Sequence, residues 1–229
     1  MAKSALQALL RAELARAADP KKSAAMQAYM KSAMPYYGVQ TPAQRAITRR
    51  LFAAHRFDTA ADWRAACLKI WREAKYREER YAAIELTGFK YYREWQTIAT
   101  LPMYEEMIVT GAWWDYVDPI ATARLGPLLR LFPAPMRKKM LQWSRGTNLW
   151  KRRSAILCQL SFKTETNLDL LYTTIEPSLA SKEFFLQKAI GWALRQYAWT
   201  DPREVCRYVR ANAARLSALS KREALKNIR

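Results

Sequence analysis

Residues 110–125 read TGAWWDYVDPIATARL, and this stretch carries the pattern on which our interpretation of the fold depends. Its central Val-Asp-Pro-Ile segment ends at Ile120, and segments of similar pattern end at Ile47, Ile84, Ile156 and Ile190. Successive isoleucines in this series lie 37, 36, 36 and 34 residues apart. A regular period of this length is typical of stacked helix pairs, each of which buries its apolar face against its neighbours.

Most of the chain has hydrophobic residues at helical spacing. One predicted helix carries an apolar stripe of Leu6, Leu9, Leu10 and Leu14 and ends before Asp19-Pro20. A second has Met26, Met30 and Met34, and a third begins with Thr41 as N-cap and Pro42 as first helical residue. No stretch shows sustained alternation of β-branched residues. We therefore predict an all-α fold, a curved solenoid of HEAT-like helix pairs forming a single domain over residues 1–229.

The composition points to a polyanionic partner. Lys and Arg number 39 against 20 Asp and Glu, which gives a net charge of +19, and the 51% hydrophobic content excludes disorder. Nucleic acid is the commonest partner of so basic a chain, with an acidic membrane surface or an acidic protein as alternatives. Three widely spaced cysteines indicate a reducing compartment, and no secretory signal or long apolar run is present. We expect a cytoplasmic protein that does not enter a membrane.

Several classes of chemistry lack the residues they need. His55 is the only histidine, and no HxxxH or CxxC spacing accompanies it. With 6 glycines and no GxGxxG, Walker or GxSxG motif, a nucleotide cradle or serine triad is not expected. We expect no metal and no organic cofactor, so any catalysis must use carboxylates, aromatic rings and arginines.

Trp114 and Asp118 are candidates for such chemistry. They lie four residues apart, so on a continuous helix they would share one face. An aromatic ring beside a carboxylate is suited to holding a cation. Asp118-Pro119 also fits an N-cap followed by a first helical residue, which would give Asp118 a structural role instead.

Basic residues recur at the start of the repeats. They comprise Lys151, Arg152 and Arg153 in one repeat, Lys182 and Lys188 in the next, and Lys221 and Arg222 near the end. On stacked repeats they would form a line of positive charge along the concave surface, which is suited to a phosphate backbone. The alternative is an ordinary solvated surface.

Five segments resemble one known family. They are Tyr29–Pro42, Tyr104–Asp118, Asn148–Leu157, Ser181–Ala198 and Leu219–Ile228, and the resemblance covers nearly the whole chain. The WWDxVD and KEFFxQKAIGWxLR motifs within them are the most specific. On these motifs the sequence is similar to the AlkD-like DNA alkylation repair family.

This resemblance implies a DNA glycosylase, built from HEAT-like repeats in a curved shell, that excises cationic N3- and N7-alkylated purines from duplex DNA. We expect the protein to be a monomer. It implies a catalytic Asp118 assisted by Trp114 and Trp192. Residues that it implies contact DNA are Arg153 and Tyr29, and the neighbouring basic positions add Lys151, Arg152, Lys188 and Arg195. Two alternatives are a catalytically silent protein that binds damaged or branched DNA and a repeat scaffold for an acidic protein.

Overall fold

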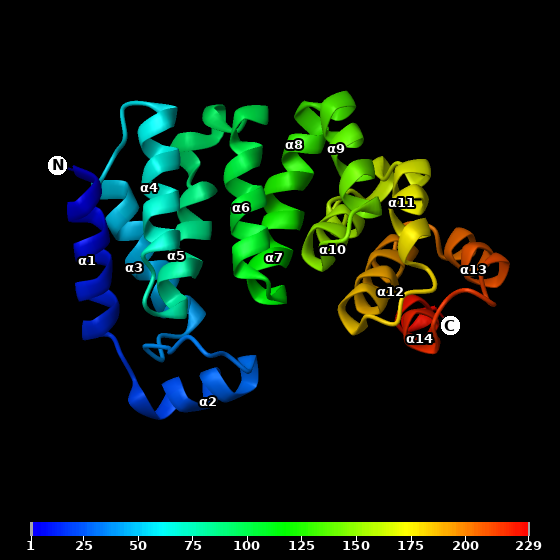
Figure 1. Cartoon of the computed structure of the whole chain (residues 1–229), viewed down its shortest axis with the longest axis horizontal. Helices are drawn as coiled ribbons and strands as arrows, with labels where there is room; N and C mark the ends of the chain where they lie inside the picture. The colour runs from blue at the N-terminus through cyan, green and yellow to red at the C-terminus, as the bar shows by residue number, and fades with distance from the viewer. Residues whose placement is uncertain (1, 229) are drawn as a thin grey trace. The chain divides into compact units, whose positions relative to one another are not determined.

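The computed structural model describes residues 2–228, with side chains from residue 5 onward. Over this range the chain is helical and contains no β-strand, which confirms the predicted all-α fold (Figure 1). The chain divides into two compact units, the first ending at Gln96 and the second beginning at Thr97. The single HEAT-like domain and its curved shape stay predictions.

From residue 2 to residue 96, which the structure describes, the first unit contains five α-helices and a 3₁₀-helix. They are α1 (Ala2–Arg16), α2 (Pro20–Met30), α3 (Thr41–Ala54), α4 (Ala60–Arg72), α5 (Arg77–Thr87) and η1 (Lys90–Trp95). Helix α1 packs against α3, α4 and α5, and α4 and α5 lie side by side (Figure 1).

The apolar stripe of α1 is narrower than the sequence suggested. Leu6, Leu10 and Leu14 are buried, whereas Leu9 is 41% exposed. Successive residues are rotated by about 100° around a helix, so Leu9 is about 60° from Leu6 but about 140° from Leu14. Leu9 therefore lies at the exposed edge of the apolar stripe.

Two predicted boundaries also shift. Helix α3 begins at Thr41 with Gln40 as its N-cap, so Thr41 is the first helical residue and not the cap. Helix α2 ends at Met30, because Lys31 takes the left-handed conformation, and Met34 lies beyond the helix. Asp19 is the N-cap of α2, and its carboxylate accepts the backbone N–H groups of the first turn.

A buried carboxylate fixes the connection between α2 and α3. Glu78 is fully buried in α5 and accepts the backbone N–H groups of Tyr37, Gly38 and Val39 at 2.9–3.1 Å. Burial raises the pKa of Glu78, and these three hydrogen bonds oppose the shift. Gly38 has φ of 87°, and a Cβ there would lie 2.1 Å from the Asp19 carbonyl oxygen. This turn therefore requires glycine.

Replacement of Gly38 should destabilise the protein. We expect Gly38→Ala to lower the free energy of unfolding by more than about 1 kcal/mol, because the left-handed conformation and the contact with Asp19 both oppose a Cβ. Urea unfolding provides the measurement. Gly146→Ala is the matched control, since its nearest neighbour would be 3.5 Å from the new Cβ and the stability should change little. Equal effects at the two positions would contradict this account.

Within the described residues 97–228, the second unit contains nine α-helices and several short helical turns. They are η2 (Ile98–Thr100), α6 (Leu101–Gly111), α7 (Trp114–Ile120), the π-helix η3 (Ala121–Leu125), α8 (Gly126–Leu131), α9 (Pro133–Arg145), α10 (Leu149–Leu157), η4 (Lys163–Glu165), α11 (Leu168–Ile175), η5 (Glu176–Ser178), α12 (Phe184–Ala198), α13 (Pro202–Ala211) and α14 (Ala218–Leu225).

The isoleucine series follows the packing of this unit. Ile120, Ile156 and Ile190 lie on α7, α10 and α12, and each is at most 1% exposed. Helix α10 packs against both α7 and α12, so helices about one period apart in sequence are neighbours in space. Helix α14 then packs beside α12 (Figure 1).

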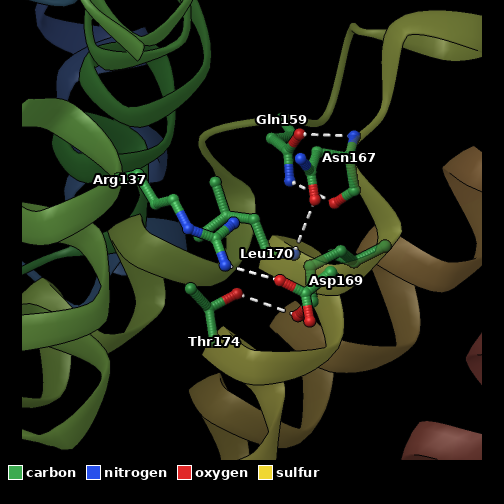
Figure 2. Close-up of polar contacts among 7 residues, drawn as sticks. Arg137, Gln159, Asn167, Asp169, Leu170 and Thr174 are labelled. Atoms are coloured by element: carbon green, nitrogen blue, oxygen red, sulfur yellow. Dashed lines mark hydrogen bonds and ion pairs between the residues drawn. The ribbon is translucent and has the colours of Figure 1, made fainter. Parts of the chain in front are cut away.

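Polar contacts join the intervening helices (Figure 2). Arg137 on α9 pairs with Asp169 on α11 at 2.5 Å. The Gln159 side chain bonds to both backbone groups of Asn167, and Asn167 in turn caps α11 by accepting the Leu170 N–H at 2.9 Å. Within residues 2–228, no helix has the length and apolar character needed to cross a membrane.

Candidate functional site

Asp118 lies inside a helix rather than at its start. Helix α7 begins at Trp114, with Trp113 as N-cap, so the alternative in which Asp118 caps a helix is wrong. Trp114 and Asp118 are one turn apart on this helix and share a face, as their spacing predicted. Pro119 lies within α7, and its missing N–H removes a hydrogen bond from the helix.

The helix changes character immediately after this proline. Residues 121–125 form a π-helix, a wider turn that is frequent at functional sites. The Thr122 hydroxyl donates to the Asp118 carbonyl at 2.8 Å. The backbone on the C-terminal side of Asp118 is thus held by a side chain as well as by the helix.

The Asp118 carboxylate forms a buried, bidentate ion pair with Arg153 of α10. Arg153 Nε donates to Asp118 Oδ1 and Arg153 Nη2 to Oδ2, both at 2.7 Å. The Asp118 side chain is 11% exposed and that of Arg153 is 5% exposed. Arg153 Nη1 donates to the Phe185 carbonyl of α12 at 2.6 Å. One guanidinium therefore links α7, α10 and α12.

Two opposing effects act on the ionisation of Asp118. Burial raises its pKa, because the charged form loses hydration. The hydrogen bonds and the positive charge of Arg153 lower the pKa, and the nearby Asp115 charge raises it. The net effect is a raised pKa.

An aromatic cluster lies next to this pair. The Phe185 ring packs against Trp113 at 5.3 Å and against Trp150 at 5.0 Å between ring centroids, and Trp113 and Trp150 are 6.2 Å apart. The Arg153 guanidinium carbon is 6.0 Å from the Phe185 ring centroid. These rings exclude water from one side of the ion pair, which strengthens its electrostatic interactions.

Trp114 and Trp192 are both half-buried. Trp114 begins α7, and Trp192 on α12 packs against the apolar core of the second unit. Each ring therefore keeps an accessible portion, which a fully buried core tryptophan such as Trp143 does not have.

The other predicted DNA-binding cations of the second unit all bond to the protein itself. Lys151 pairs with Glu105 at 2.5 Å, and Arg152 donates to the Pro177 carbonyl and the Ser178 hydroxyl at 2.9 Å. Glu223 accepts from both Lys188 and Arg195, at 3.0 and 2.5 Å. Their contact with DNA stays a prediction.

Tyr29 belongs to the first unit, where it is 77% exposed near the end of α2. So large an exposed aromatic side chain is available to a partner. Among the described residues, no group of three or more His, Cys, Asp or Glu side chains is placed to hold a metal ion.

Sequence reasoning missed the aromatic cluster. Trp114, Trp150 and Phe184 each stand six residues before an isoleucine of the series, but the cluster consists of Trp113, Trp150 and Phe185. Phe184 is instead 57% exposed. The adjacent aromatic pairs WW at 113–114 and FF at 184–185 were the signal that could have revealed this cluster. The side chains of two adjacent residues on a helix point in different directions, so either member of a pair could join it.

Comparison with known proteins agrees with the resemblance. Residues 10–228 match the family described as DNA alkylation repair enzyme. The fold is similar to that of a solved protein described as "Predicted DNA alkylation repair enzyme from Enterococcus faecalis". The TM-score is 0.84 at 29% identity, over 92% of this chain and 96% of that one. No protein of curated function matches the sequence.

Breaking the Asp118–Arg153 pair should be costly in stability. Asp118→Asn and Arg153→Gln should each lower the free energy of unfolding by about 3–5 kcal/mol, because each leaves one buried charge without its partner. The double variant removes both charges and should cost less than either single change. Urea unfolding of the four proteins measures this coupling. A double variant whose loss equals the sum of the single losses would argue against it.

Proposed function

Because this chain belongs to the DNA alkylation repair enzyme family, we propose that it is a DNA glycosylase that excises cationic N3- and N7-alkylated purines from duplex DNA. The observation that carries the proposal is the buried Asp118 carboxylate, oriented by Arg153 and located one helical turn from a half-exposed tryptophan. This arrangement suits the stabilisation of a cation without metal chemistry or a histidine acid.

The substrate itself supplies the leaving group. A purine alkylated at N3 or N7 already carries positive charge, so it departs as a neutral base and needs no protonation. As the N-glycosidic bond breaks, positive charge develops on the deoxyribose, as in glycoside hydrolysis. The enzyme then has to stabilise that charge and direct a water molecule to the sugar carbon.

Asp118 fits both tasks. A carboxylate has about four lone-pair sites, and Arg153 uses two of them, which leaves acceptor capacity for the attacking water. Arg153 also favours the ionised form and fixes the carboxylate plane. The pair has no net charge, so Asp118 must lie nearer the sugar than Arg153 does. The greater exposure of the Asp118 side chain, 11% against 5%, is consistent with that order.

Trp114 and Trp192 would pack against the sugar and the developing cation. A tryptophan ring attracts a cation by roughly 0.5–2 kcal/mol. Since about 1.4 kcal/mol corresponds to a tenfold change in rate, each ring supplies a smaller effect than the carboxylate. The two rings therefore tune a reaction that depends mainly on Asp118.

Duplex DNA is the partner that suits the charge of the chain. Lys151, Lys188 and Arg195 are partly exposed in pairs with Glu105 and Glu223. Exposed ion pairs contribute only about 0–1 kcal/mol, so a phosphate can replace the glutamate at little cost. We propose that these cations meet the DNA backbone by such an exchange.

The second candidate, a silent protein that binds damaged DNA, would not need an ionised carboxylate. Its binding could use the same cations. The buried ion pair favours the glycosylase, because an Asp118–Arg153 pair is a weak source of stability compared with apolar packing. Release of free base distinguishes the two.

The decisive experiment measures release of 7-methylguanine from duplex DNA. We expect the parent protein to release the base without added metal or cofactor, and Asp118→Asn/Arg153→Gln to be slower by about 10²–10³, the scale for one preorganised electrostatic group. The double variant is preferred to Asp118→Asn because it leaves no unpaired buried charge. Arg137→Gln/Asp169→Asn removes another ion pair of the same unit and should keep the parental rate. Near-parental release by the first variant would refute the mechanism.

The pH dependence tests the ionisation of Asp118. If the ionised carboxylate is required, the single-turnover rate should fall as pH falls through the pKa of Asp118, which burial places above the ordinary aspartate value. Arg153→Lys keeps the counter-charge but loses the bidentate hydrogen bonds, so it should move this fall to higher pH. If Arg153 instead contacts a phosphate, Arg153→Gln should weaken the dependence of log affinity on log salt by about one, and Arg153→Lys should not move the pH profile.

A further inference from the structure

We propose that Arg56 and Lys90, held against the Tyr91 ring, form a second DNA contact that binds backbone phosphates. This site lies in the first unit and contains none of the residues discussed above. The proposal depends on the duplex DNA partner of the proposed function but not on its excision chemistry.

The Tyr91 ring is a fixed support for these cations. It is 36% exposed, and Phe89 packs edge-on against it at 5.0 Å between centroids. Phe89 in turn packs against the fully buried Phe52 at 5.7 Å. The ring is therefore anchored to the core on one side and open to solvent on the other.

Arg56 is held in place by the Tyr91 ring and not by hydrogen bonds from its guanidinium N–H groups. Its guanidinium carbon lies 3.8 Å from the Tyr91 centroid, a distance at which the cation covers the ring face. The N–H groups of a guanidinium lie in its plane, so a ring contact leaves them free. Among the described residues, Arg56 has no hydrogen-bond or ion-pair partner. A rigid fork of free N–H groups suits bidentate binding of a phosphate.

Lys90 adds a second positive charge at the same ring. Its Nζ lies 5.4 Å from the Tyr91 centroid. Within residues 2–228 neither cation forms an ion pair, and the acids nearest in sequence, Asp58 and Glu94, form none with them. Two like charges brought together without an acid repel each other. An oxyanion bound beside them would relieve that repulsion.

This pattern contrasts with the cations of the second unit. Lys151, Lys188 and Arg195 each have a glutamate partner, so a phosphate there must displace a carboxylate. Arg56 and Lys90 need no such exchange. In FKYYREW at 89–95, Tyr91 is the exposed aromatic residue and Lys90 precedes it, and an exposed ring beside cations is also a feature of nucleic-acid-binding surfaces. Among polyanions, the family favours DNA.

The test measures binding to an unmodified duplex, so that the outcome does not depend on excision. We expect Arg56→Gln/Lys90→Gln to bind more weakly and to reduce the slope of log affinity against log salt by about 1–2, since each neutralised phosphate contributes about 0.9. Fluorescence anisotropy over a series of salt concentrations gives this slope. Glutamine keeps most of each side-chain stem, and circular dichroism verifies the fold.

Three further variants distinguish the effect of the site at the Tyr91 ring from the effect of net charge. Arg64→Gln/Lys75→Gln removes the same charge from the same unit, at residues with no aromatic-ring contact among the described residues, and should leave the slope nearly unchanged. Tyr91→Phe keeps the ring and should behave like the parent, whereas Tyr91→Ala should reduce the slope. An unchanged slope in Arg56→Gln/Lys90→Gln, or an equal reduction in the Arg64/Lys75 control, overturns the proposal.

Discussion

The buried ion pair between Asp118 and Arg153 is the constraint on which the second unit depends. Removing two charges from water is expensive, and only the two 2.7 Å hydrogen bonds and the added bond to the Phe185 carbonyl offset that cost. The three groups come from α7, α10 and α12, whose packing brings them together. The helices therefore have to keep one register, because a displaced carboxylate would leave the guanidinium buried and unpaired.

The same constraint makes the site rigid before any substrate arrives. Arg153 orients the carboxylate plane, the aromatic cluster excludes water from one side, and the π-helix after Pro119 alters the backbone at that point. In the proposed reaction, a dipole fixed in this way would need no reorganisation when charge develops on a bound sugar. Burial raises the free energy of the two charges and also strengthens the electric field around them. The cost in stability and the proposed role in catalysis therefore have the same cause.

The sequence predicted the helices better than the contacts between them. The isoleucine period identified α7, α10 and α12 because the core repeats with the helices, and spacing alone put Trp114 and Asp118 on one face. No such rule predicted that Arg153 would bind Asp118, since the two residues are 35 apart. Asp118-Pro119 suggested a cap because local preference ignores tertiary packing, which keeps this proline inside a helix. The aromatic cluster was missed because its members shift by one residue between repeats.

The excess positive charge of the chain acts over longer distances than the interactions within the candidate site. Arg153 and Lys151 are each paired with a carboxylate, and Lys188 and Arg195 share the carboxylate of Glu223, so these four cations are largely neutralised by their partners. Most of the surplus of +19 must then reside on cations without acidic partners, such as Arg56. The surplus positive charge attracts a polyanion over a long distance and makes binding sensitive to salt. In contrast, Arg153 is already paired with Asp118, so it does not hold a phosphate in place of the carboxylate. In the proposed reaction, the distant cations would attract the DNA, and the Asp118 carboxylate would remain available to stabilise a cation on the sugar.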